Sequence, residues 1–83
     1  MYYVYLLEGR DGARYVGCTA DLKQRLNQHN AGESPHTSKF RPWKVAAYIA
    51  LPTEAQAVAF EKYLKQGSGH AFAARHFWTR RND

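Results

Sequence analysis

The chain has 83 residues, with 12 Lys and Arg against seven Asp and Glu, which gives a formal net charge of +5 and a pI near 9.6. A chain of this length is expected to form a single domain over residues 1–83. It contains no apolar run long enough to cross a membrane and no recognisable signal peptide, so we expect a cytoplasmic protein. Its one cysteine, Cys18, excludes an internal disulfide and a zinc site built from several cysteines. The positive charge favours phosphate backbones over membrane surfaces as partners.

The pattern of apolar residues, glycines and prolines predicts six elements in the order β-β-α-β-α-α. They are strands over 2–7 and 13–18, a helix from about 21 to 30, a strand over 43–51, and helices over 53–66 and 70–78. Residues 8–12 are expected to form the turn between the first two strands, and residues 33–39 an exposed loop. This order predicts an α+β fold in which helices flank a small, three-stranded, mainly antiparallel sheet.

The ends of the predicted helices are marked by capping residues. Thr19 or Asp21 can accept hydrogen bonds from the first free backbone N–H groups of the helix that follows. Thr53, with Gln56 three residues later, has the spacing of a capping box. Residues 67–69, with two glycines, are expected to end the second helix before the last one begins.

The first helix carries two charged or titratable residues on its apolar stripe. Leu22, Arg25, Leu26 and His29 follow the i, i+3, i+4, i+7 spacing of one helix face. An inward guanidinium is costly unless it is paired or lines a cleft. The alternative is structural: Arg25 extends from the edge of the stripe to solvent, and His29 is a hydrogen-bonded histidine at the core boundary.

The second helix repeats this anomaly with an acid. Glu61 has Ala57, Val58 and Leu64 as neighbours at helical spacing. Acids are seldom buried unless they are paired or bind a metal ion. A metal-ligand role therefore competes with a structural ion pair between Arg25 and Glu61.

Two tyrosines on the predicted hairpin are expected to converge. Side chains alternate across a strand, so Tyr3 and Tyr5 share one face, as do Tyr15 and Gly17 on the return strand. Tyr5 and Tyr15 can then meet on one side of the hairpin. The alternative is that they form an aromatic cross-strand pair that only stabilises the hairpin.

Together these residues resemble the signature of the GIY-YIG nuclease family. The first tripeptide of the family appears as Tyr3-Val4-Tyr5 and the second as Tyr15-Val16-Gly17. Arg25 stands four residues before His29, and Glu61 matches the metal-binding glutamate of the family. The chain is most similar to the compact, free-standing bacterial branch, which is related to the catalytic domain of excision-repair and structure-selective endonucleases.

The resemblance implies a metal-dependent endonuclease that hydrolyses phosphodiester bonds in DNA. Glu61 would hold one Mg²⁺ or Mn²⁺ ion, and Arg25 would stabilise charge on the phosphate. Tyr5 would be the general base, which requires either a lowered pKa or a proton that leaves in concert with attack. Tyr15 and His29 would orient the water or contact phosphate.

The match to the family has three departures. The first tripeptide begins with Tyr3 where the family has glycine. Cys18 stands where some members have a lysine, and no residue matches the asparagine found after the glutamate helix, Asn82 being close to the terminus. These departures concern substrate positioning more than the reaction. A nucleic-acid-binding module that kept the fold without catalysis is the alternative function. RNA stays an alternative substrate, and a protein partner for targeting is a further expectation.

The C-terminal part interleaves aromatic and basic residues. With one loop lysine they form the expected nucleic-acid-binding set: Lys39, Arg75, Trp78, Arg80 and Arg81. Exposed rings stack on unpaired bases, so this pattern predicts a preference for single-stranded or structured DNA. The alternative is that the neighbouring rings of Phe72 and Phe77 pack on the sheet.

Overall fold

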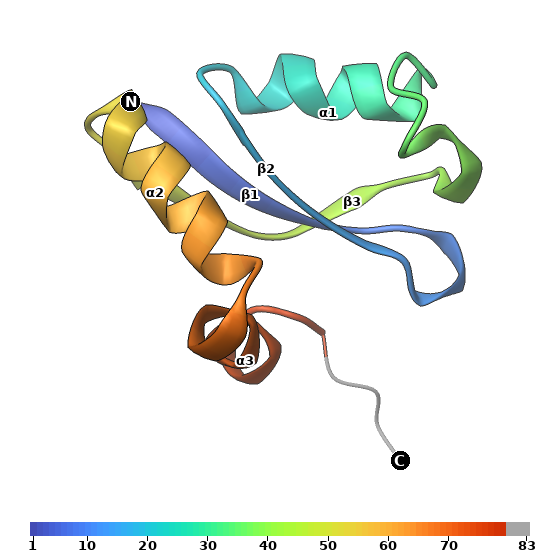
Figure 1. The fold of residues 1–83 in the computed structure, drawn as a ribbon. Coiled ribbons are helices and arrows are strands. Elements are labelled where there is room, and N and C mark those ends of the chain that lie inside the picture. The colour runs from blue at the N-terminus through green and yellow to red at the C-terminus, as the bar shows by residue number, and fades with distance from the viewer. Residues whose placement is uncertain (80–83) are drawn as a thin grey trace.

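The structure is a computed structural model that describes residues 1–79 (Figure 1). Its elements are β1 (Tyr2–Glu8), β2 (Arg14–Thr19), α1 (Leu22–Asn30), β3 (Lys44–Leu51), α2 (Glu54–Leu64) and α3 (Gly67–His76), with short 3-10 turns at Arg10–Gly12 and Ser38–Phe40. The predicted α+β class and the order β-β-α-β-α-α are confirmed. No helix within residues 1–79 is both long and apolar enough to cross a membrane.

The sheet is antiparallel throughout and has the order β2-β1-β3, so β1 is its central strand. Because side chains alternate, the two faces of β1 pack against different layers. Tyr5 and Leu7 point to the side covered by α1, whereas Val4 and Leu6 point to the side covered by α2 and α3. Figure 1 shows α1 and the α2–α3 pair on opposite sides of the sheet.

The helix starts follow from local hydrogen bonds. Asp21 caps α1 because its carboxylate accepts from the backbone N–H of Gln24 at 3.0 Å, while the Thr19 hydroxyl accepts from the backbone N–H of Asp21 at 3.1 Å. The Thr53 hydroxyl caps α2 by accepting from the backbone N–H of Gln56 at 3.2 Å. The predicted capping residues are thus confirmed, with Asp21 chosen over Thr19.

The last helix begins earlier than predicted. Gly67 has a φ of +50°, a conformation that favours glycine, and it starts α3 instead of only ending α2. Gly69 is buried where α3 meets the end of α2, and a Cβ atom there would collide with the backbone carbonyl of Tyr63. The two glycines therefore allow a tight turn and a close approach between the helices.

The predicted exposed loop at 33–39 is anchored at one residue, which corrects that expectation. Thr37 is 1% exposed, and its carbonyl accepts a hydrogen bond from the Trp43 indole nitrogen at 2.7 Å. The Asn30 side chain binds both backbone polar groups of Trp43, at 2.6 and 3.0 Å. These contacts hold the loop against the C-terminal end of α1.

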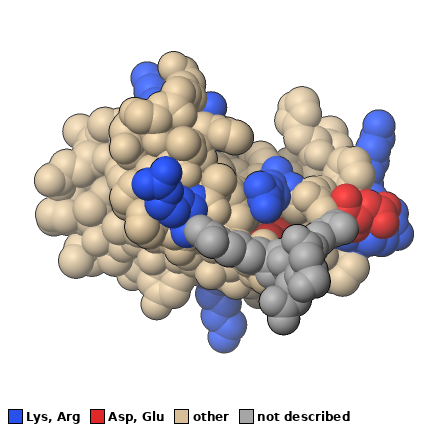
Figure 2. Space-filling view, turned by 90° about the horizontal axis from the view of Figure 1, so that it is seen from below, with Lys and Arg blue, Asp and Glu red and all other residues tan. Residues whose placement is uncertain are grey.

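The prediction that Trp78 is an exposed stacking residue is wrong. Trp78 is 8% exposed and lies in the core with Val4 and Leu6, because its large apolar ring fills the space between the sheet and the last helices. Thr79 fixes the segment by donating to both carboxylate oxygens of Glu8, from its backbone N–H at 2.6 Å and its hydroxyl at 2.8 Å. Basic side chains predominate over acidic ones on the face that carries α3 (Figure 2).

Candidate active site

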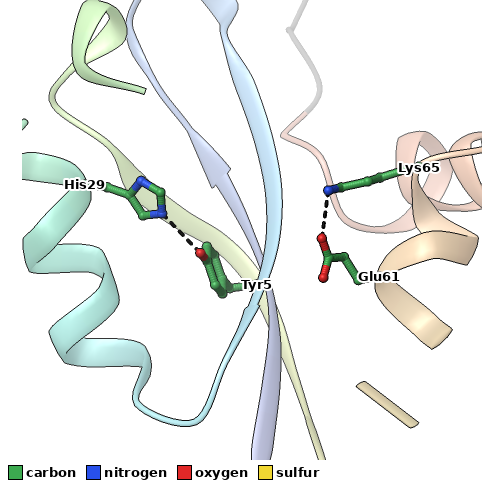
Figure 3. Close-up of polar contacts among 4 residues, drawn as sticks. All are labelled: Tyr5, His29, Glu61 and Lys65. Atoms are coloured by element: carbon green, nitrogen blue, oxygen red, sulfur yellow. Dashed lines mark hydrogen bonds and ion pairs between the residues drawn. The ribbon is translucent and has the colours of Figure 1, made fainter. Parts of the chain in front are cut away.

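Tyr5 occupies the centre of the site. It is 1% exposed, and its hydroxyl lies 3.0 Å from Nε2 of His29 on α1 (Figure 3). Gly17 is the β2 residue opposite Tyr5, and a Cβ atom at that position would collide with the Tyr5 hydroxyl. The glycine of the second tripeptide is therefore required so that the Tyr5 ring can lie across β2.

His29 is held from both ring nitrogens. It is fully buried, and its Nδ1 lies 2.8 Å from the hydroxyl of Thr37, which donates to the carbonyl of Ser34 at 3.4 Å. Since a threonine hydroxyl has one hydrogen, this oxygen accepts from Nδ1–H. Nε2 is then the unprotonated nitrogen and accepts from the Tyr5 hydroxyl. The network thus favours the tautomer in which His29 can receive a proton from Tyr5.

Both partners of this pair are neutral. Burial, and secondarily the charge of Arg25, lowers the pKa of His29. Burial raises the pKa of Tyr5, and the opposing interaction with Arg25 does not cancel this effect. Of the two routes open to Tyr5 as a base, the site therefore opposes a preformed phenolate and favours loss of the proton in concert with attack.

Tyr15 and Arg25 complete the side of the site that faces α1. The Tyr15 ring centroid lies 6.2 Å from that of Tyr5 and 5.0 Å from that of His29, so the predicted convergence of the tyrosines is confirmed. The Arg25 guanidinium interacts with the Tyr5 and Tyr15 hydroxyls, and the interaction with Tyr5 is the larger cause of its raised pKa. Arg25 also donates to the Gln28 side-chain oxygen at 3.0 Å. Its guanidinium is thus oriented beside both phenols.

Glu61 approaches from the opposite side of the sheet. Its carboxylate accepts from the ammonium of Lys65, one helical turn later, at 2.7 Å. Figure 3 shows this pair and the Tyr5–His29 pair with β2 between them. The structural alternative of an Arg25–Glu61 ion pair does not form. The negative charge of Glu61 nevertheless acts on Tyr5, where it contributes to the raised pKa.

The donor set around Glu61 suits one hydrated, hard cation. Within the described residues there is no group of three or more His, Cys, Asp or Glu side chains that could hold a metal ion. A single carboxylate fits Mg²⁺ or Mn²⁺, which keep several waters and accept substrate oxygens as ligands. The carboxylate side chain is 22% exposed, so an ion can reach it, and the metal-ligand role requires the Lys65 ammonium to leave it.

The remaining predicted binding residues lie outside this cluster. Lys39 is exposed in the 3-10 turn after α1, and Arg75 lies in the last turn of α3. Arg80 and Arg81 lie outside the described residues. The sequence analysis missed Thr37 and Lys65; only Lys65 had a signal, its i+4 spacing from Glu61 on a helix.

Fold and site together are those of a nuclease-type catalytic domain, with paired tyrosines, an arginine and a lone helical carboxylate around the edge of a small sheet. Comparison with known proteins agrees: the family model of the GIY-YIG catalytic domain matches residues 1–73. The chain belongs to the GIY-YIG family.

Several relatives are small proteins of similar length. A UPF0213 protein of Cupriavidus pinatubonensis is 35% identical over 68 residues, covering 81% of this chain and 76% of the relative. One from Streptococcus agalactiae is 37% identical over 70 residues, covering 83% and 80%. The solution structure of a UPF0213 protein from Bacillus halodurans superimposes with a TM-score of 0.57 at 28% identity, covering 93% of this chain and 87% of that one.

A larger relative has an informative name. The structure-specific endonuclease subunit slx1 of Schizosaccharomyces japonicus is 40% identical over 67 residues. The match covers 72% of this chain but only 24% of slx1. The similarity therefore concerns one part of that protein.

Proposed function

We propose that this protein is a metal-dependent endonuclease that hydrolyses phosphodiester bonds in DNA. The observation that carries the proposal is the hydrogen bond of 3.0 Å between the Tyr5 hydroxyl and Nε2 of His29, in a site that also contains Arg25. A buried, neutral phenol bonded to a neutral imidazole is suited to proton transfer. A structural tyrosine would also need an acceptor for its buried hydroxyl, so the Arg25 guanidinium beside the same phenol is what favours a catalytic role.

In the proposed reaction, Tyr5 takes a proton from the attacking water while its own proton passes to Nε2 of His29. The Thr37 hydroxyl keeps His29 in the required tautomer by accepting from Nδ1–H. Arg25 stabilises the negative charge that develops on the phosphate, as a fixed guanidinium can. Tyr15, beside the Tyr5 and His29 rings, helps to orient the water. A divalent ion held by Glu61 would supply Lewis-acid stabilisation of the phosphate and the leaving oxygen.

A preference for DNA with unpaired or branched segments belongs to the same proposal. It is supported by the name of the slx1 relative, a structure-specific endonuclease subunit. Stacking of bases on Trp78 does not contribute to this preference, because that ring is buried.

A nucleic-acid-binding module without catalysis is the second candidate. The Glu61–Lys65 ion pair of 2.7 Å favours it, because the ammonium occupies the carboxylate that the metal needs. Only the nuclease is expected to cut DNA when a divalent metal ion is added; the binding module is expected to bind without cutting.

The deciding experiment incubates the protein with labelled single-stranded, duplex, flapped and branched DNA and with RNA. Each substrate is tested with Mg²⁺, with Mn²⁺ and with EDTA, and a Glu61→Ala variant purified in parallel excludes a contaminating nuclease. We expect cleavage only with a metal ion and only by the unaltered protein. Binding without cleavage under every condition would instead establish the binding module.

A further inference from the structure

A pocket opens beside the candidate active site, between β2 and the junction of α2 and α3. Its volume is about 290 Å³, and its walls include Arg14 and Tyr15 of β2, Lys65 at the end of α2, His70 of α3 and Trp78. Tyr15 belongs to both the pocket and the active site. The pocket and the active site are therefore adjacent, with Tyr15 shared between them.

The pocket has a rigid floor. Trp78 is 8% exposed and packs in the main core. The residue after it, Thr79, is bound to Glu8 at the end of β1 by two hydrogen bonds, of 2.6 and 2.8 Å. The shape of the pocket is thus maintained by contacts between residues at opposite ends of the described chain.

Two cations lie at the pocket on aromatic faces. The Arg14 guanidinium carbon lies 5.1 Å from the Trp78 ring centroid, and the Lys65 ammonium lies 6.0 Å from that of Tyr15. A cation–π contact holds a cation in place without neutralising its charge. The cross-strand neighbour of Arg14 is Glu8, but both carboxylate oxygens of Glu8 accept hydrogen bonds from Thr79. Among the ion pairs of the described residues, none involves Arg14.

We propose that this pocket binds the sugar–phosphate unit next to the scissile phosphodiester, with its phosphate on Arg14 and Lys65. The inference rests on the proposed function and adds a second phosphate site to it. Arg14, which is held over Trp78 and forms none of the described ion pairs, and the neighbouring His70 favour an anion, and the volume suits one sugar–phosphate unit. A divalent ion at Glu61 would release Lys65 from its ion pair of 2.7 Å, and the ammonium can then turn to the bound phosphate.

The first test measures binding without catalysis. Fluorescence anisotropy in EDTA compares Arg14→Gln with the unaltered protein on a single-stranded oligonucleotide over a range of salt concentrations. We expect Arg14→Gln to weaken binding about tenfold, as for loss of one charge-assisted contact, and to lower the salt slope by about one. Lys62→Gln is the control, because Lys62 is exposed on the same helix as Lys65 and does not line the pocket.

The second test locates the contact. Oligonucleotides with one uncharged methylphosphonate, moved along the strand, are cleaved by each variant with Mg²⁺. At one linkage adjacent to the cut, we expect the uncharged group to lower the cleavage rate of the unaltered protein about tenfold. The same group should lower the rate of Arg14→Gln less than twofold, because that variant has already lost the contact. A full methylphosphonate penalty in Arg14→Gln would overturn the second phosphate site alone. So would a loss of affinity in Lys62→Gln equal to that in Arg14→Gln. Absence of metal-dependent cleavage by the unaltered protein would overturn the proposed function with it.

Discussion

The Tyr5 hydroxyl lies 3.0 Å from Nε2 of His29 because Gly17, the residue opposite Tyr5 on β2, has no side chain. Three elements thus meet at one hydrogen bond: the central strand supplies the phenol, the edge strand leaves the space, and α1 supplies the imidazole. The hydrogen bond from Nδ1 to Thr37 then decides which ring nitrogen faces Tyr5.

Removing the hydroxyl of Tyr5 should stop proton transfer while the fold is kept. We expect Tyr5→Phe to lower kcat by roughly 10²–10⁴-fold, the range for loss of a general base. It should also lower the free energy of unfolding by about 1–3 kcal/mol, because buried Nε2 loses its partner. Steady-state kinetics and urea denaturation measure the two effects. Tyr2→Phe on the same strand is the control, and wild-type kcat in Tyr5→Phe would exclude Tyr5 as the base.

Adding a methyl group at Gly17 should displace Tyr5. The new Cβ atom would collide with the Tyr5 hydroxyl, so the ring must move away from His29. We expect Gly17→Ala to destabilise the protein by about 1–3 kcal/mol, as overpacking does, and to reduce cleavage strongly. Thermal unfolding and a cleavage assay test this, with Cys18→Ala at the next position as control. Unchanged stability and cleavage would contradict the geometry at Tyr5.

Arg25→Ala should affect the rate more than binding. Arg25 interacts with the two phenols and Gln28 and forms no ion pair with Glu61, so its loss should leave the protein folded. If the guanidinium serves mainly the transition state, kcat and kcat/KM fall together. Single-turnover kinetics and a melting curve separate the two roles. Unfolding of the variant at assay temperature would show that Arg25 is structural.

Glu61→Ala should abolish cutting without abolishing DNA binding. Glu61 is the proposed metal ligand and belongs to no larger group of metal-binding side chains within residues 1–79, whereas the proposed phosphate contacts are those of basic residues. Cleavage assays with Mg²⁺ and anisotropy in EDTA measure the two properties. Glu54→Ala, an exposed acid in the first turn of the same helix, is the matched control. Full cleavage by Glu61→Ala at ordinary metal concentration would remove Glu61 from the site.

Stability should decrease as the pH falls below about 6.5, the ordinary pKa of histidine. Burial, then the charge of Arg25, lowers the pKa of His29 in the folded protein, so between the folded and unfolded pKa values only the unfolded chain binds the proton. The contribution of neutral His29 to the free energy of unfolding is complete above about pH 6.5 and is lost as the pH falls towards the folded-state pKa. The free energy of unfolding changes over this range by at most about 1.4 kcal/mol per pH unit. Urea denaturation from pH 5 to 7.5 measures it.

The matched variants for this pH effect are His29→Gln and His36→Gln. His36 is exposed, so its replacement should leave the pH dependence unchanged, whereas His29→Gln should remove the contribution assigned to His29. The same pH dependence in both variants would assign the effect to other groups.

Local periodicity was enough to predict much of this protein from its sequence. Strand alternation places Tyr5 and Tyr15 on one face, and helical spacing directs Arg25 and His29 towards the sheet. The capping residues Asp21 and Thr53 mark helix starts through hydrogen bonds that span only a few residues. Such features depend on short-range geometry that every helix and strand repeats, so the α+β fold could be predicted without coordinates. The family was identified separately, from the resemblance of the two tripeptides to its signature.

Only the tertiary structure decided the partners of these groups. Glu61 had two candidate partners, an arginine or a metal ion, and the structure pairs it with Lys65. Trp78 could have been exposed or buried, and it fills the core because the chain after α3 returns to the end of β1. Thr37 carries no signal in the sequence, yet it sets the tautomer of His29. Each of these outcomes depends on which surfaces pack together, since packing selects one partner among several that local sequence allows.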